Sequence, residues 1–265
     1  MSSPDLRDRM WLWAHEAGSQ NAHWGLPRPS RMTPTEAAFY MGIPNVLMVV
    51  YGGKPVPPFD LHARAMSPLK RVVWSIVGDS SSTRNDQSTD LDEVLRLAAE
   101  FPNIHGAIMD DFFHEPNAEG KVARYSEADL AGFRAQLHCA AHPLDFWVVL
   151  YSHQLHLPVA SHLDECDAVT FWTWKAEDLP KLEANFARFE QVAPNARKIL
   201  GCYLWDYGTH TPMPLDLFRH QYGLGLRWLR EGRIEGMIFL ATCICDLGLD
   251  TVEWLRETLS KEISE

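Results

Sequence analysis

The chain has 265 residues, of which 46% are hydrophobic and 22% are charged, and its formal net charge is −11. One α/β barrel commonly takes about 250 residues, so the sequence fits one folded domain over residues 1–265 and not a disordered chain. The negative charge disfavours nucleic acid and anionic membranes as partners, because both attract basic surfaces.

No apolar run approaches the roughly 18 residues of a membrane-spanning helix. The N-terminal segment also lacks the apolar stretch of a signal peptide. We therefore expect a cytoplasmic protein that does not act at the membrane, with an export signal already removed as the alternative. The odd number of cysteines, and their mostly apolar surroundings, predict reduced thiols and not a disulfide framework. Cys243 and Cys245 lie in an apolar run that predicts a strand.

Predicted strands alternate with predicted helices along the first half of the chain. A strand over Met10–His15 comes first, and a helix over Pro34–Met41 follows, with Thr33 as its cap and Glu36 as the capping-box partner. The next predicted elements, in chain order, are strands Val46–Tyr51 and Val72–Val77, a helix from Thr89 or Asp90 to Ala99, and the strand Gly106–Asp110.

The second half continues the same alternation. Ser126 caps a predicted helix that reaches about Ala140, with Asp129 at the capping-box position. The remaining predicted strands are Phe146–Tyr151, Ala168–Trp174, Ile199–Trp205 and Gly236–Thr242. The remaining predicted helices are a short one over Pro158–Cys166, one capped by Asp178 that ends at Val192, Leu215–Glu231, and one from about Asp250 to Lys261.

Several of these strands are continuous apolar runs, such as VLMVVY and FWVVLY, which is typical of parallel strands covered on both faces. A doubly wound open sheet is the rival arrangement, and it would carry a glycine-rich phosphate turn. Neither a GxGxxG nor a Walker pattern occurs in the sequence. Eight strand units, most of them followed by a helix, therefore favour a closed (β/α)₈ TIM barrel.

In such a barrel the active site lies at the C-terminal ends of the strands. Asp110 and Asp111 directly follow the apolar fourth strand. Two adjacent carboxylates repel each other, so one should have a raised pKa unless a cation intervenes, and such a pair suits general acid–base catalysis. We expect one of them to be catalytic and the other structural, and the sequence leaves open which.

A second catalytic carboxylate is expected from Asp206, after the seventh strand, or from Glu16, after the first. Retaining glycosidases hold their two carboxyl groups about 5–5.5 Å apart and inverting ones about 6.5–9.5 Å, and the sequence does not choose between them. The expected substrate-binding residues are polar or aromatic side chains at the strand ends: His15, Asn21, Tyr51, Asp79, Tyr151, His153, Trp172, Trp174, Trp205 and Tyr207.

The aromatic residues indicate a sugar ligand, because flat rings stack on the C–H faces of pyranoses. The tryptophans assigned to the core instead are Trp11, Trp13, Trp74, Trp147 and Trp228. Two long non-helical segments, 19–33 and 52–68, are expected to shape a cleft, with Arg28, Arg31, His23 and Trp24 reaching over the mouth. The polar loop 80–88 would either bond sugar hydroxyls or simply be solvated.

The block HGAIMDDFF resembles the acid-bearing fourth strand of TIM-barrel glycoside hydrolases. Acids after strands four and seven are similar to the placement in the large retaining glycosidase superfamily, which uses Glu at both positions where this chain has Asp. The chitinase-like DxxDxDxE pattern is absent. The resemblance covers the architecture and a short stretch around the motif, and it implies a carbohydrate-processing enzyme without a cofactor, acting on a small-molecule or oligosaccharide substrate.

Two alternatives stay open. A metal-dependent hydrolase or isomerase would draw its ligands from His15, Glu16, Asp79, Asp110, Asp111, His153 and Asp206, although neither an HxH pair after the first strand nor an HExxH motif occurs. A sugar-binding barrel without catalytic activity is the other alternative.

Overall fold

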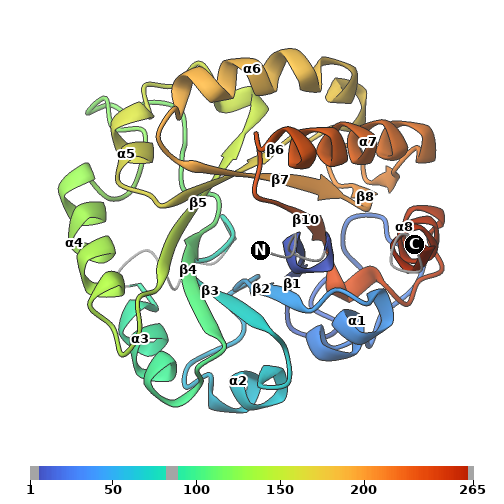
Figure 1. The fold of residues 1–265 in the computed structure, drawn as a ribbon, viewed down its shortest axis with the longest axis horizontal. Helices are drawn as coiled ribbons and strands as arrows, with labels where there is room; N and C mark the ends of the chain where they lie inside the picture. Colours follow the sequence, from blue (N-terminus) through green and yellow to red (C-terminus); the bar gives the residue numbers. More distant parts are fainter. Residues whose placement is uncertain (1–5, 82–88, 262–265) are drawn as a thin grey trace.

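Eight parallel strands close into a barrel in the computed structural model of the chain, which describes residues 6–81 and 89–261 (Figure 1). Around the barrel the strand order is β1-β10-β7-β6-β5-β4-β3-β2. The barrel strands are β1 (Met10–Ala14), β2 (Asn45–Met48), β3 (Arg71–Val77), β4 (Ile104–Met109), β5 (Asp145–Tyr151), β6 (Ala168–Trp172), β7 (Arg197–Tyr203) and β10 (Gly236–Leu240). The predicted TIM barrel is therefore confirmed.

The α-helices form a ring outside the barrel (Figure 1). They are α1 (Pro34–Met41), α2 (Asp60–Met66), α3 (Leu91–Glu100), α4 (Glu127–His138), α5 (Ala160–Asp164), α6 (Leu182–Val192), α7 (Leu215–Glu231) and α8 (Asp250–Lys261). Within residues 6–81 and 89–261, no helix combines the length and the apolar character needed to cross a membrane. The cysteines of this chain are all free thiols, as expected.

Local sequence signals set several helix starts. Thr33 accepts a hydrogen bond from the Glu36 amide while the Glu36 side chain bonds the Thr33 amide, so the predicted capping box is present. Ser126 and Asp129 form the same arrangement at the start of α4. Both boxes satisfy amide groups that the first turn of a helix otherwise leaves unbonded.

Other predicted boundaries are wrong. The segment 52–68, expected to be non-helical, contains α2. Asp178 does not cap α6, because it lies in a 3-10 turn, Ala176–Lys181, that precedes that helix. Cys243 and Cys245 lie not in a strand but in and after a second 3-10 turn, Thr242–Ile244, although both are buried.

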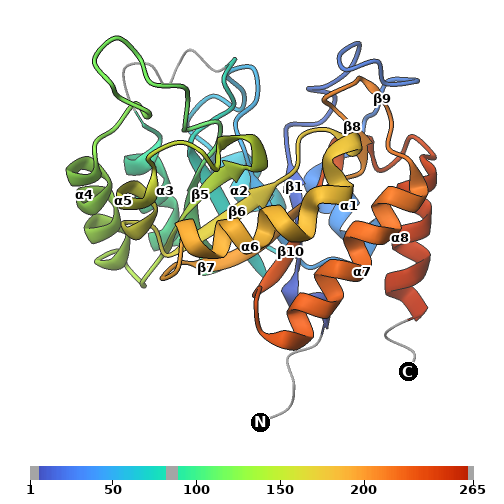
Figure 2. The same cartoon turned by 90° about the horizontal axis from the view of Figure 1, so that it is seen from above.

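Strand β7 also ends earlier than expected. It stops at Tyr203, and Trp205 belongs to β8 (Trp205–Asp206), which pairs with β9 (Thr211–Pro212) in a small antiparallel hairpin. The hairpin rises above the barrel on the same side as the loop that follows β1 (Figure 2). This early stop changes which residues of the segment face the barrel mouth.

Tryptophan pairs fill the barrel interior at two levels. Trp11 packs edge-on against Trp147 toward the N-terminal end of the strands, with ring centroids 5.1 Å apart. Trp13 packs edge-on against Trp172 nearer the mouth, at 5.2 Å. Gly201 on β7 makes room for the upper pair, because a Cβ atom there would collide with the Trp172 ring.

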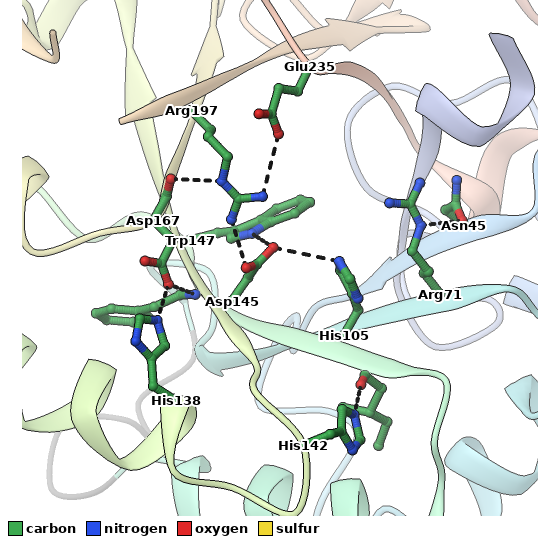
Figure 3. Close-up of polar contacts among 12 residues, drawn as sticks. Asn45, Arg71, His105, His138, His142, Asp145, Trp147, Asp167, Arg197 and Glu235 are labelled. Carbon is green, nitrogen blue, oxygen red and sulfur yellow. Dashed lines mark hydrogen bonds and ion pairs between the residues drawn. The ribbon is translucent and has the colours of Figure 1, made fainter. Parts of the chain in front are cut away.

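Paired charges surround the N-terminal end of the barrel, at the starts of the strands (Figure 3). Arg197 bonds Asp145 at 2.7 Å and Glu235 at 3.4 Å, while Lys70 bonds Asp8 at 2.6 Å. These groups line a cavity of about 550 Å³ together with Trp11 and Trp147. At this end of the barrel, basic and acidic side chains therefore compensate each other.

Candidate active site

A second cavity, of about 500 Å³, lies at the C-terminal mouth of the barrel. Its walls come from the ends of the strands and from the loops that follow them, as expected for this fold. The lining residues are Trp13, His15, Gln20, Trp24, Tyr51, Asp79, Ser80, Asp110, Asp111, Phe113, His114, Tyr151, His153, Gln154, Trp172, Trp174, Tyr203, Tyr207 and Leu240.

Asp110 and Asp111 follow β4 and occupy different environments within the cavity wall. Asp110 is only 6% exposed, and one of its carboxyl oxygens accepts the Asp111 amide at 2.9 Å. Burial, followed by the negative charges of Asp111 and Asp79, raises the pKa of Asp110 well above its usual range. Asp110 therefore holds its proton to a higher pH than an ordinary aspartate does.

The Asp111 carboxylate accepts one hydrogen bond at each of its oxygens. Tyr151 donates its hydroxyl to Oδ1 at 2.9 Å, and the Ser80 amide donates to Oδ2 at 3.0 Å. Asp111 has a φ of 41°, in the left-handed region that residues other than glycine seldom occupy, although Asp is among the more tolerant types. The turn directs the two neighbouring carboxyl groups into one cavity, and the two donors orient the Asp111 carboxylate.

Tyr151 and Tyr203 place two phenol groups near this pair. Burial is the largest cause that raises the pKa of each tyrosine well above its usual range, and the charges of Asp110 and Asp111 add to it. Both phenols therefore keep their protons and act as hydrogen-bond donors at neutral pH. Trp174 packs edge-on against both rings, with centroid distances of 6.1 Å to Tyr151 and 5.6 Å to Tyr203.

Two of the lining histidines are neutral at pH 7. Burial lowers the pKa of His15 to about 4. The Nδ1 of His15 lies 3.0 Å from the Val49 carbonyl oxygen, which only accepts, so Nδ1 carries the proton and Nε2 is an acceptor. Burial likewise lowers the pKa of His153, whose ring stacks on Tyr151 at 5.3 Å. The cavity thus offers both donors and acceptors for hydroxyl groups.

The loop after β1 forms part of the rim and is tied down by side-chain hydrogen bonds. Trp24 donates its indole N–H to the Tyr51 hydroxyl at 2.8 Å, and Tyr207 donates its hydroxyl to Gln20 at 2.8 Å. Trp205 donates its indole N–H to the Trp24 carbonyl at 2.8 Å. These bonds join segments that are far apart in the sequence and hold Trp24 against the cavity.

The structure brings most of the sequence-predicted residues together at this cavity. Those that line it are His15, Tyr51, Asp79, Asp110, Asp111, Tyr151, His153, Trp172, Trp174 and Tyr207. Glu16, Asn21, Trp205 and Asp206 do not. Asn21 instead exchanges two hydrogen bonds with the backbone of Ser30, at 3.0 and 2.8 Å, and so braces its own loop.

The Asp206 carboxylate is engaged by its own neighbourhood. Oδ1 accepts the amides of Gly208 and Thr209 at 3.1 and 3.3 Å. Oδ2 accepts the Thr209 hydroxyl at 2.7 Å and the Ala176 amide at 3.3 Å. These bonds shape the β8–β9 turn, so Asp206 organises this loop and does not line the mouth cavity.

Several lining residues are missing from the sequence-based binding set. Trp13 is buried in the core, as predicted, and it also lines the cavity. Tyr203 was hidden inside a strand predicted to run on to Trp205. Gln154 follows β5, and its side-chain amide donates a hydrogen bond to the Phe113 carbonyl at 2.9 Å. No local sequence pattern predicts this contact. Among the expected rim residues, Trp24 lines the cavity, whereas His23, Arg28 and Arg31 do not.

The polar loop lies partly outside the described residues, because 82–88 fall there, and Ser80 lines the cavity. Among residues 6–81 and 89–261, no three His, Cys, Asp or Glu side chains come together in an arrangement that would hold a metal ion.

No protein-family model matches the chain, and no curated protein sequence matches it. Solved structures share its fold. A proposed α-L-fucosidase from Bacteroides thetaiotaomicron VPI-5482 superposes with a TM-score of 0.61 at 11% identity, covering 87% of this chain and 85% of that one. Active domain 2 of a chitinase from Pyrococcus furiosus gives 0.57 at 12% identity, covering 97% and 96%.

A tryptophan synthase α-subunit from Pyrococcus furiosus gives a TM-score of 0.53 at 8% identity, covering 97% of this chain and 98% of that one. At such identities the likeness shows the barrel fold alone, and the same fold carries different chemistries. The function has to be argued from the residues at the mouth.

Proposed function

We propose that this protein is a glycoside-processing enzyme whose sugar substrate binds in the cavity at the barrel mouth. The observation that carries the proposal is the carboxyl pair after β4. The buried Asp110 has a raised pKa, whereas the neighbouring Asp111 accepts hydrogen bonds from Tyr151 and Ser80. Such opposed environments are how enzymes assign acid and base roles to two carboxyl groups.

In the proposed mechanism, Asp110 donates its proton to the oxygen that leaves when the glycosidic bond breaks. Asp111 supplies the negative charge that stabilises the oxocarbenium-like sugar in the transition state, or attacks it directly. The cavity aromatics, including Trp174 and Trp24, would stack on the sugar ring, while the phenols and neutral histidines bond its hydroxyl groups. Fold likeness to glycoside hydrolases is consistent with this proposal but does not carry it.

One observation favours a second candidate, a sugar-binding barrel without turnover. The carboxylates expected across the mouth, Asp206 and Glu16, do not line the cavity. Catalysis would then depend on the adjacent pair Asp110 and Asp111, with Asp79 as a further carboxyl group in the cavity wall.

A screen of 4-nitrophenyl glycosides that covers both anomers tests the two candidates. Turnover by the wild type that falls at least a hundredfold in both Asp110→Asn and Asp111→Asn supports the enzyme. Sugar binding that persists in both variants, without turnover by the wild type, supports the binding protein. Full activity in both variants would rule out the proposed mechanism.

A further inference from the structure

Among the described residues, the acidic and strongly basic side chains in the wall of the mouth cavity are all aspartates. Three aspartates line it, Asp79, Asp110 and Asp111, and no lysine or arginine does. The arginines of the loop after β1 do not contribute. Arg31 is exposed and pairs with Glu36 at 3.0 Å outside the cavity.

The negative charge of Asp111 is not compensated by the groups that bond it. Its partners are a phenol and a backbone amide, both neutral. Nor do His15 and His153 supply a positive charge at pH 7, since burial lowers the pKa of both. A bound ligand would therefore meet an anion in a partly buried wall, where solvent and salt screen poorly.

The opposite end of the barrel provides the internal contrast. There the chain sets Arg197 between Asp145 and Glu235, and pairs Lys70 with Asp8. The acids of that cavity thus have cations within hydrogen-bonding distance. The absence of a cation among the groups that bond Asp111 is a local property of that site and not simply a consequence of the net charge of the chain.

We propose that the mouth cavity selects a sugar residue that is uncharged or carries an ammonium group, and rejects uronic acids and phosphorylated or sulfated sugars. This inference rests on the proposed function and narrows its substrate class. An anionic substituent would repel Asp111 and find no basic side chain among the described lining residues, whereas an ammonium group would form an ion pair with Asp111.

Matched sugars test the proposal. Glucose, glucosamine and glucuronic acid form one set, and galactose, galactosamine and galacturonic acid form another, each measured at pH 7 by isothermal titration calorimetry and saturation-transfer NMR. In whichever set binds, we expect the uronic acid to bind at least tenfold more weakly than the neutral sugar. The amino sugar should bind at least as tightly as the neutral one.

Asp111→Asn should reduce the ratio of the dissociation constants, uronic acid to neutral sugar, at least threefold. Glu115→Gln is the matched control, because it removes an exposed carboxylate of the same loop that pairs with His156 at 3.0 Å and does not line the cavity. Glu115→Gln should leave this ratio unchanged. If Asp111→Asn does not fold, the ratio measured with the wild type decides alone.

A uronic acid that binds as well as its neutral counterpart would overturn this inference and leave the proposed function standing. An equal reduction of the ratio of dissociation constants in Asp111→Asn and Glu115→Gln would also overturn the inference, because the selectivity would then come from overall charge. Absence of binding for all six sugars, together with an empty glycoside screen, would remove the proposed function and this inference with it.

Discussion

The hydroxyl of Tyr151, at the end of β5, donates a hydrogen bond of 2.9 Å to Oδ1 of Asp111, which follows β4. The two residues are 40 positions apart in sequence, and the parallel pairing of β4 with β5 brings them together at the mouth. Tyr151 is therefore placed to position the carboxylate and to support its charge.

Tyr151→Phe should lower the turnover number of the active glycoside by at least tenfold and change KM less. Hydrogen bonds to charged groups are worth about 1.5–3 kcal/mol, and this bond supports the ionised Asp111 on which the transition state depends. Steady-state kinetics on the purified variant measures the effect. Tyr40→Phe is the matched control, since it removes a tyrosine–carboxylate bond of 2.6 Å to Glu253 outside the cavity. Wild-type turnover in Tyr151→Phe would contradict the positioning role.

The Asp110→Asn variant should gain stability relative to the wild-type protein as the pH rises. The folded protein holds a proton on Asp110 that the unfolded chain releases above about pH 4, so wild-type stability falls with pH until the raised pKa of the folded state is passed. The asparagine carries no such penalty. Thermal unfolding of both proteins between pH 4 and pH 8 gives the difference in Tm, which should grow as the pH rises above 4. A constant difference would show that Asp110 ionises normally in the folded protein.

His15 should give the stability of the protein the opposite dependence on pH: its contribution to the free energy of unfolding is lost as the pH falls. Its pKa falls from an ordinary value of 6.5 to about 4, so the unfolded chain binds a proton that the folded protein does not. The stability due to neutral His15 is complete above pH 6.5 and is lost as pH falls to about 4, by up to about 3 kcal/mol at 1.36 kcal/mol per pKa unit.

His15→Asn should therefore flatten the acid limb of the stability profile measured by urea unfolding, while its amide can still donate to the Val49 carbonyl. His220→Gln, at an exposed position on α7, serves as the control and should leave that limb in place. An unchanged slope between pH 4 and pH 6.5 in His15→Asn would count against a neutral buried His15.

The strand and helix pattern of this sequence was enough to predict the barrel, because continuous apolar runs and capping boxes are local signals. The acids after β4 were predictable for the same reason, since they follow an apolar strand directly. The position of Asp206 at a strand end did not predict the hydrogen bonds that its carboxylate makes. Its partners Gly208 and Thr209 follow within three residues, and an aspartate that bonds amides two or three residues on is a familiar turn pattern.

Tyr203 and Trp205 show a different limit. They share a face only if the strand continues through both, but β7 stops at Tyr203 and the chain turns into the β8–β9 hairpin. Tyr203 then lines the cavity, whereas Trp205 donates to the Trp24 backbone. This bond joins the hairpin to the distant loop after β1, and no short window of the sequence contains both partners.

Gly201→Ala should disturb the floor of the cavity. The added methyl group would collide with the ring of Trp172, which packs against Trp13 beneath the proposed sugar site. Overpacking in a well-filled interior typically costs about 1–3 kcal/mol, so we expect a lower free energy of unfolding and at least tenfold weaker sugar binding as Trp172 shifts into the cavity.

Gly223→Ala on α7 is the control. Its added methyl group meets no atom within 4 Å, and replacing a helical glycine by alanine should stabilise the protein by roughly 0.5–1 kcal/mol. Unaltered sugar affinity in Gly201→Ala, together with unaltered tryptophan fluorescence, would mean that the position of Trp172 does not set the shape of the binding site.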